Sequence, residues 1–110
     1  MPHLVLIAKY PSHLQSAVTK KALEARKKNL FPDDEHLQEV LVSSAGILTE
    51  EGIKLLGVTL VKEGKLEDAL KSVMKELAYF SEIEGFESSV EVWATREEGY
   101  QAFGIEPPKD

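Results

Sequence analysis

The sequence predicts one domain of the α+β class, with its elements in the order strand, helix, strand, strand, helix, strand. An apolar, β-prone run opens the chain, and two later segments place apolar residues at the spacing of amphipathic helices. Another segment near the end alternates apolar and polar residues, as a strand with one covered face does. The 110 residues are about the size of one domain, and 43% hydrophobic with 29% charged residues is typical of a globular protein.

The first strand is predicted over residues 3–10, where a mostly apolar run ends at Pro11. Such a run is typical of a central strand that is covered on both faces. Ser12 and Gln15 match a capping box, in which two side chains bond the free amides at the start of a helix. We therefore expect the first helix to span about 13–28, with basic residues in its last turn that complement the helix dipole.

A loop rich in acidic residues separates this helix from two further strands, predicted over 37–48 and 53–62. Residues 49–52 between them suit a hairpin connection. In the later strand both faces carry apolar side chains, which is unusual for a sheet backed by solvent. One face would hold Ile53, Leu55, Thr59 and Val61, and the other Lys54, Leu56, Val58, Leu60 and Lys62. We expect a helix to cover one face and a second chain to cover the other.

The second helix is predicted over about 65–83 from a stripe of apolar residues at helical spacing. Gly85 follows and tolerates the left-handed backbone that ends many helices. The last strand, over 86–95, alternates strictly, and Trp93 faces away from the apolar side of that strand. A second capping-box pattern, from Thr95 to Glu98, opens a short terminal helix.

This order of elements predicts a ferredoxin-like βαββαβ plait, a four-stranded antiparallel sheet with two helices on one face. Residues 1–105 would form this single domain and 106–110 a C-terminal tail. The face without helices would hold leucines, valines and Trp93, an apolar patch larger than monomers usually expose. We therefore expect another molecule to cover it.

Two stretches are similar to a known superfamily. They are the run Val-Lys-Glu-Gly-Lys-Leu-Glu-Asp-Ala-Leu at 61–70 and the run Ile-Glu-Gly-Phe-Glu at 83–87. With the order of elements, they resemble the dimeric α+β barrel superfamily, and within it small uncharacterised stand-alone members. The resemblance implies a homodimer of plaits packed sheet against sheet, and a cavity between sheet and helices that some relatives use for substrates or cofactors. The superfamily includes monooxygenases, haem-binding enzymes and ligand-sensing domains, so the fold does not choose the function.

Composition narrows the classes of partner and chemistry. The chain has no cysteine, which excludes disulfides, thiolate nucleophiles and Cys-ligated metal centres. Its formal net charge of −6 disfavours nucleic acid and anionic membranes as partners. The strands expected at the centre of the sheet also lack the aromatic residues on which RNA-binding plaits stack bases. We recognise no signal peptide or membrane anchor, and expect a cytoplasmic protein.

No residue pattern identifies a catalytic site, a metal site or a cofactor. The three histidines, His3, His13 and His36, lack the short spacing of metal ligands. The adjacent serines and the adjacent glutamates come without a base or partner at a useful spacing. Catalytic residues therefore stay unknown, and we predict no metal and no cofactor.

Aromatic residues are the candidates for a ligand pocket, namely Tyr10, Tyr79 and Trp93, since their rings offer contact area to an apolar or aromatic molecule. The competing interpretation is that these rings only fill the core or an interface. The candidates for a dimer interface are Leu56, Val58, Leu60 and Trp93.

The sequence favours a small homodimeric α+β-barrel protein that assembles through its sheet face and binds a small apolar or aromatic ligand. Two alternatives stay open. A cofactor-independent, monooxygenase-like enzyme would need a closed cavity on the order of several hundred Å³, lined by Tyr10, Tyr79 or Trp93 and holding a polar group. An effector-binding regulatory module would hold its ligand at an interface between chains.

Overall fold

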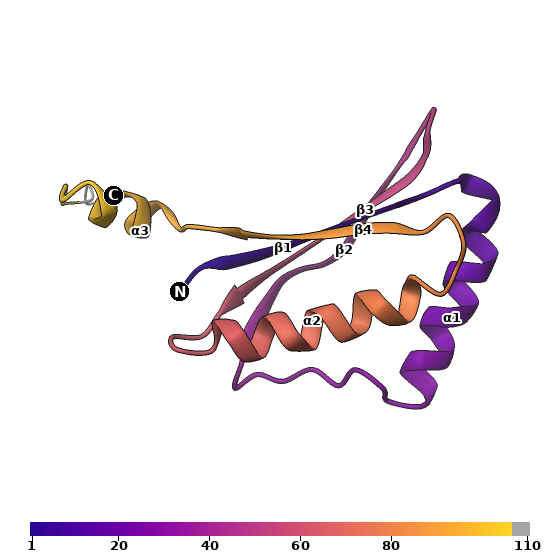
Figure 1. Cartoon of the computed structure of the whole chain (residues 1–110), viewed down its shortest axis with the longest axis horizontal. Helices are drawn as coiled ribbons and strands as arrows, with labels where there is room; N and C mark the ends of the chain where they lie inside the picture. The colour runs from indigo at the N-terminus through magenta and orange to yellow at the C-terminus, as the bar shows by residue number, and fades with distance from the viewer. Residues whose placement is uncertain (107–110) are drawn as a thin grey trace.

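The computed structural model describes residues 1–106 and shows a mixed α+β fold built on a four-stranded antiparallel sheet (Figure 1). The predicted α+β class and the four-stranded antiparallel sheet are confirmed. Of the predicted tail, residues 107–110 lie outside the described residues. The elements are β1 (His3–Tyr10), the 3₁₀ turn η1 (Ser12–Leu14), α1 (Gln15–Lys27), β2 (Gln38–Thr49), β3 (Gly52–Val61), α2 (Leu66–Phe80), β4 (Glu87–Trp93) and α3 (Arg96–Ala102).

The strands lie in the order β2-β3-β1-β4, so the first strand of the chain is central, as its apolar run predicts. Figure 1 shows α1 and α2 on the same side of the sheet, while α3 lies beyond one end of it. β1 coincides with its predicted range, and the predicted hairpin joins β2 to β3. α2 is shorter than predicted, because the turn from Ser81 onward leaves the helix before Gly85.

The two predicted capping boxes differ in outcome. The box at Thr95 is present, since its hydroxyl accepts from the Glu98 amide at 3.2 Å and its own amide donates to the Glu98 carboxylate at 2.8 Å. The box at Ser12 is wrong, because neither η1 nor α1 has a side-chain cap. The side chain of Gln15 instead forms hydrogen bonds with two other residues. It accepts a hydrogen bond from the Tyr10 hydroxyl and donates one of 3.1 Å to Thr19.

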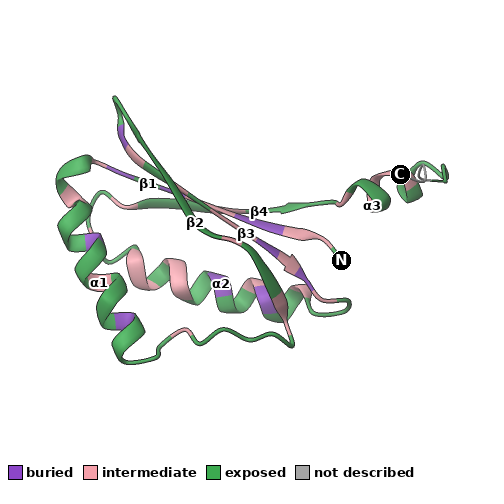
Figure 2. Ribbon diagram, turned by 180° about the vertical axis from the view of Figure 1, so that it is seen from behind, coloured by how far each residue is buried: buried purple, intermediate pink, exposed green. Residues whose placement is uncertain are grey.

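The core lies between the central strands and α2. Leu4 of β1 and Val61 of β3 are fully buried, and they pack with Ala69 and Val73 of α2. Both helices bury two residues, but α2 also packs the partly buried Leu66, Leu70 and Leu77 against this cluster, to which α1 adds no residue. In Figure 2 both helices carry buried residues, but most of the rest of α1 is exposed, whereas α2 has many residues of intermediate burial. Because α1 presents few large side chains to the sheet, space remains between α1, α2 and the strands.

The strand register separates the two faces of the sheet. Residues paired directly across antiparallel strands project to the same face. His3 pairs with both Leu60 and Trp93, and the same face of β1 pairs with Val58 and Leu56. The four predicted interface residues therefore share one face, opposite to the face that holds the core. Leu56 is 39% and Trp93 is 56% exposed there.

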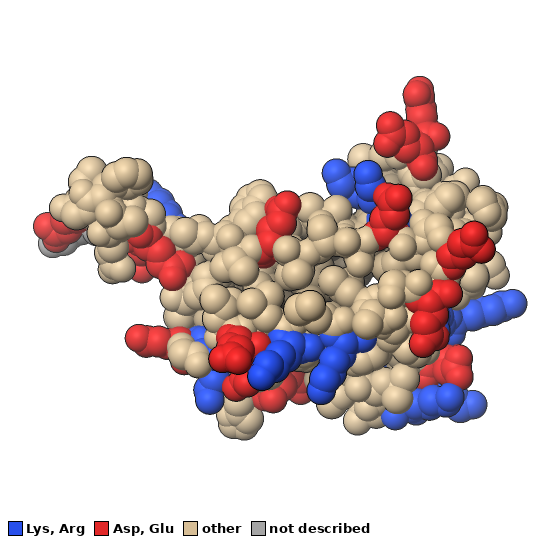
Figure 3. Space-filling view, viewed as in Figure 1, with Lys and Arg blue, Asp and Glu red and all other residues tan. Residues whose placement is uncertain are grey.

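The β2–β3 hairpin depends on a glycine. Gly52 has a φ of +124°, and a Cβ at this position would overlap the backbone oxygen of Tyr10. Only glycine accepts both the backbone angle and the close approach. On the face viewed in Figure 3, charged side chains gather over the helices and at the tip of this hairpin, and the surface between them is largely uncharged. Within residues 1–106, no helix has the length and apolar character needed to cross a membrane.

Candidate functional site

A cavity of about 280 Å³ lies between α1, α2 and the sheet. Most of its walls are apolar side chains from β1, β3, both helices and the residue before β4, among them Leu6, Leu55, Val18, Leu77, Phe80 and Phe86. Its polar side chains are Ser43, Ser44 and Glu76. An apolar enclosure with a few polar groups is the usual composition of a small-molecule site.

Small residues give the cavity its depth. Ala8 of β1, Ala22 of α1 and Gly57 of β3 all line it. Gly57 pairs with Leu6 across the sheet, and a Cβ on it would lie 3.7 Å from the Ser43 carbonyl oxygen and 3.8 Å from the Leu6 Cβ. Those are ordinary contacts, so the fold does not require glycine here. The missing side chain leaves room in the cavity instead.

An irregularity in β2 brings two serines to the cavity. The pairing of β2 with β3 shifts between Val40 and Val42 and again between Val42 and Ala45. Ser43 and Ser44 fall within the second shift and line the cavity. Bulges re-aim side chains and are frequent beside functional sites. The irregular pairing therefore coincides with the two serines in the cavity wall.

Glu76 is the carboxylic acid of this cavity. It is half-buried on α2, one turn after the buried Val73 and next to Leu77, which packs against the core. Burial raises the pKa of Glu76 above its usual value, and the negative charge of Asp33 raises it further. The two causes are separate, since burial removes water from the carboxylate and Asp33 repels its negative charge, and both disfavour the ionised form.

A second, more polar cavity of about 480 Å³ adjoins the first. The two share Glu76 and Ser43 as well as Ala22 and Phe80 in their walls. The polar cavity adds charged and amide side chains from α1 and the loop that follows it, namely Arg26, Asn29 and Asp33. Glu76 therefore stands at the boundary between an apolar compartment and a polar one.

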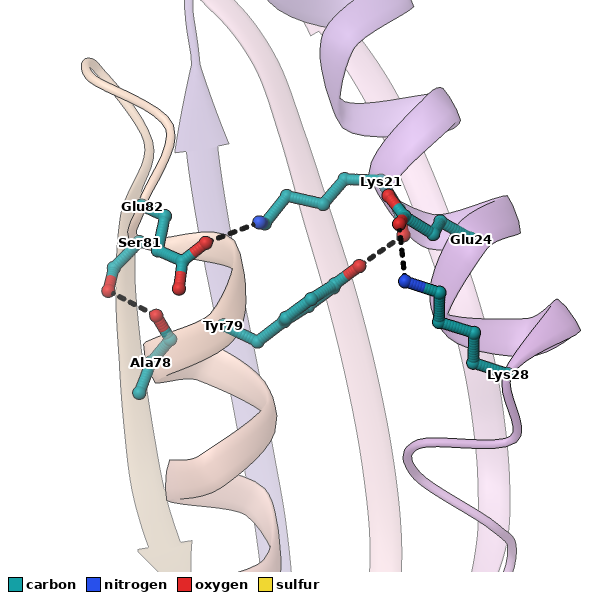
Figure 4. A network of polar contacts seen from close by, with 7 residues as sticks. All are labelled: Lys21, Glu24, Lys28, Ala78, Tyr79, Ser81 and Glu82. Atoms are coloured by element: carbon teal, nitrogen blue, oxygen red, sulfur yellow. Dashed lines mark hydrogen bonds and ion pairs between the residues drawn. The ribbon is translucent and has the colours of Figure 1, made fainter.

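Polar contacts also join α1 to the end of α2 (Figure 4). The Tyr79 hydroxyl donates a hydrogen bond of 3.0 Å to the backbone oxygen of Lys21. The Lys21 ammonium lies 4.0 Å from the centre of the Tyr79 ring and 2.7 Å from the Glu82 carboxylate. The hydrogen bond that the Lys21 ammonium donates to Glu82 raises the pKa of Lys21. These contacts hold the middle of α1 against the end of α2.

The structure does not bring the three predicted pocket aromatics together, and none of them lines either cavity. Tyr10 is 3% exposed and stacks on Phe86 with ring centres 5.8 Å apart, so it lies behind a ring that lines the cavity. Burial raises the pKa of Tyr10. Tyr79 donates its hydroxyl hydrogen bond to the backbone of Lys21 in α1, as described above. Trp93 lies on the opposite face of the sheet, where its indole N–H donates to the Glu91 carboxylate at 2.8 Å.

Sequence reasoning missed Glu76 and the two serines, although each leaves a signal. Val73, Glu76, Leu77 and Phe80 follow helical spacing, so Glu76 places a charge within the apolar stripe of α2. Ser43 and Ser44 interrupt the otherwise apolar run of residues 40–48. A polar residue at a position that the pattern assigns to the core is a signal of a site, because burying it without a partner costs free energy.

The described residues 1–106 hold no group of three or more histidine, aspartate or glutamate side chains placed to bind a metal ion. Comparisons of the chain with models of protein families, with curated proteins and with solved structures gave no significant match. Function is therefore inferred from the geometry of this chain alone.

Proposed function

We propose that this protein binds a small, largely apolar molecule in the cavity between its helices and its sheet. The supporting observation is the cavity itself, a space of about 280 Å³ with apolar walls and three polar side chains. Small-molecule sites have this composition and begin near ~300 Å³. A 150 Å³ cavity holds benzene, so by proportion this one accepts a body of about a dozen non-hydrogen atoms.

We further propose that the fold is a ferredoxin-like plait and that a second copy of the chain covers its open face. The strand order β2-β3-β1-β4, with a hairpin at one edge, supports the plait. The apolar side chains of Leu56, Val58, Leu60 and Trp93 on one face support the pairing, as does Ile47, which is 60% exposed and pairs with Lys54 of that face. Burying these side chains against their copies removes apolar surface from water.

The binding function fits the cavity better than the two alternatives. A monooxygenase-like enzyme was expected to place Tyr10, Tyr79 or Trp93 in the cavity, and its lining contains none of them. A regulatory module would bind its effector between chains, whereas elements of one chain line this half-open space.

The test uses 1-naphthalenemethanol, a neutral molecule of the expected size, titrated into the protein by isothermal calorimetry. We expect saturable binding to the natural chain. Ala22→Leu places a larger side chain in the wall of both cavities and should weaken the affinity by about tenfold or more. Ala17→Leu is the matched control, since it makes the same exchange at an exposed position of α1 outside the lining. Absence of binding to the natural chain, or equal affinity of both variants, would contradict the proposal.

A further inference from the structure

The position of Glu76 restricts which ligand the cavity can hold. An ionised carboxylate among apolar side chains is costly unless a donor or a positive charge compensates it. Glu76 lies on the apolar stripe of α2, yet within residues 1–106 it makes no hydrogen bond or ion pair. The cavity thus contains an anionic group whose partner the chain itself does not provide.

Two other charged side chains line the same region. Arg26 comes from α1 and Asp33 from the loop after it, and both line the polar cavity with Glu76. One guanidinium therefore stands against two carboxylates, so the region is negative when both acids are ionised. Neither Arg26 nor Asp33 forms an ion pair in the part of the chain that the structure describes. A ligand with a positive group would relieve the repulsion between Glu76 and Asp33, and one with a carboxylate would increase it.

We propose that the ligand is an amine with an apolar body, and that Glu76 binds its ammonium group at the boundary between the two cavities. The apolar body then fills the cavity of about 280 Å³ that Leu6, Leu55 and Leu77 line. An ammonium has three donors, and the Ser43 hydroxyl in the walls of both cavities can accept one of them. This inference depends on the proposed binding function, because it assigns the polar end of a ligand whose body occupies that cavity.

Three molecules with one apolar body test this selectivity. 1-Naphthylmethylamine is an ammonium at pH 7, 1-naphthalenemethanol is neutral, and 1-naphthoic acid is an anion. Titration calorimetry of the natural chain at pH 7 should show the amine binding about tenfold more tightly than the alcohol, the scale of one added charge-assisted hydrogen bond. The acid should bind more weakly than the alcohol.

Glu76→Gln keeps the size of the side chain and removes its charge. This variant should lose the preference for the amine and keep the affinity for the alcohol. Glu67→Gln is the matched control, because Glu67 lies on the exposed side of the same helix and outside both linings. It should leave both affinities unchanged.

The outcomes separate the two proposals. If the alcohol binds and the amine binds no more tightly, the amine proposal is overturned and the binding function stands. If neither molecule binds, both are overturned.

A pH series on the natural chain avoids any folding defect of the variant. The amine preference should disappear as the pH falls and Glu76 becomes protonated while Arg26 stays charged, and a preference that persists after protonation would assign the ammonium to another group.

Discussion

The hydroxyl of Tyr79 donates a 3.0 Å hydrogen bond to the backbone oxygen of Lys21, and this contact joins α2 to α1 (Figure 4). The Lys21 ammonium lies over the Tyr79 ring, 4.0 Å from its centre, and forms an ion pair with Glu82. α1 adds no residue to the core cluster of Leu4, Val61, Ala69 and Val73, so the polar contacts at its middle supplement a weak apolar attachment. The position of α1, and with it the shape of the cavity, depends in part on this tyrosine.

Tyr79→Phe should lower the free energy of unfolding by about 0.5–1.5 kcal/mol, the usual net contribution of one hydrogen bond. The ring remains and keeps its edge contacts with Phe31 and Phe80, so the apolar packing is unchanged. Urea denaturation measures the loss, and amide hydrogen exchange should quicken in α1 more than in α2. Tyr100→Phe, on the peripheral α3, is the control and should change neither quantity. Equal stability of Tyr79→Phe and the natural chain would show that the contact does not hold α1.

The raised pKa of Glu76 makes a prediction about stability and pH. Because the folded protein holds the Glu76 proton more tightly than the unfolded chain, the contribution of this group to stability falls as the pH rises through its pKa. Glu76→Gln cannot ionise, so it should be more stable than the natural chain at pH 7. The difference should shrink as the pH falls toward about 4, where the unfolded carboxyl also becomes protonated.

Urea denaturation at pH 7 and at pH 4 measures this difference. Glu63→Gln, in the exposed turn before α2, is the control and should show no such dependence on pH. If Glu76→Gln were less stable than the natural chain at pH 7, the carboxylate would be stabilised in the folded protein, which contradicts the direction of its pKa.

The apolar sheet face without helices predicts a dimer, and a single substitution to lysine on that face should prevent it. Leu56→Lys would place a charge at the centre of the apolar face, where pairing with a second copy would bury it without a partner. Sedimentation velocity at tens of micromolar should show the natural chain as a dimer and this variant as a monomer. Leu23→Lys, at a position 59% exposed on α1, makes the same exchange away from that face and should remain a dimer. A monomeric natural chain would refute the dimer.

Most local features of this fold were predictable from neighbouring residues. The run of residues 3–10 indicated a central strand, the apolar stripe after Leu66 indicated α2, and the pattern from Thr95 to Glu98 indicated the start of α3. The division of β3 into two faces also follows from alternation alone, and the register confirms it. Periodicity succeeds here because a strand or helix that buries one face repeats its burial at a fixed spacing.

The candidate site was not predictable in the same way. Tyr10 and Tyr79 are aromatic residues near α1, but packing turned one toward Phe86 and the other toward the backbone of Lys21. Gln15 matched the capping-box pattern, yet its side chain accepts a hydrogen bond from Tyr10 of β1. In each case the partner belongs to another element, and no spacing within one element identifies it.

By itself, the sequence determined the α+β class, the extent of most strands and helices, and which residues of β3 share a face, because these follow from short-range periodicity. Only the tertiary structure decided that a cavity exists and that Glu76, Ser43 and Arg26 meet at its boundary. These residues lie on three different elements, and the space between them results from a bulge in β2 and the loose packing of α1. A cavity is what packing leaves unfilled, so it depends on how all the elements fit together.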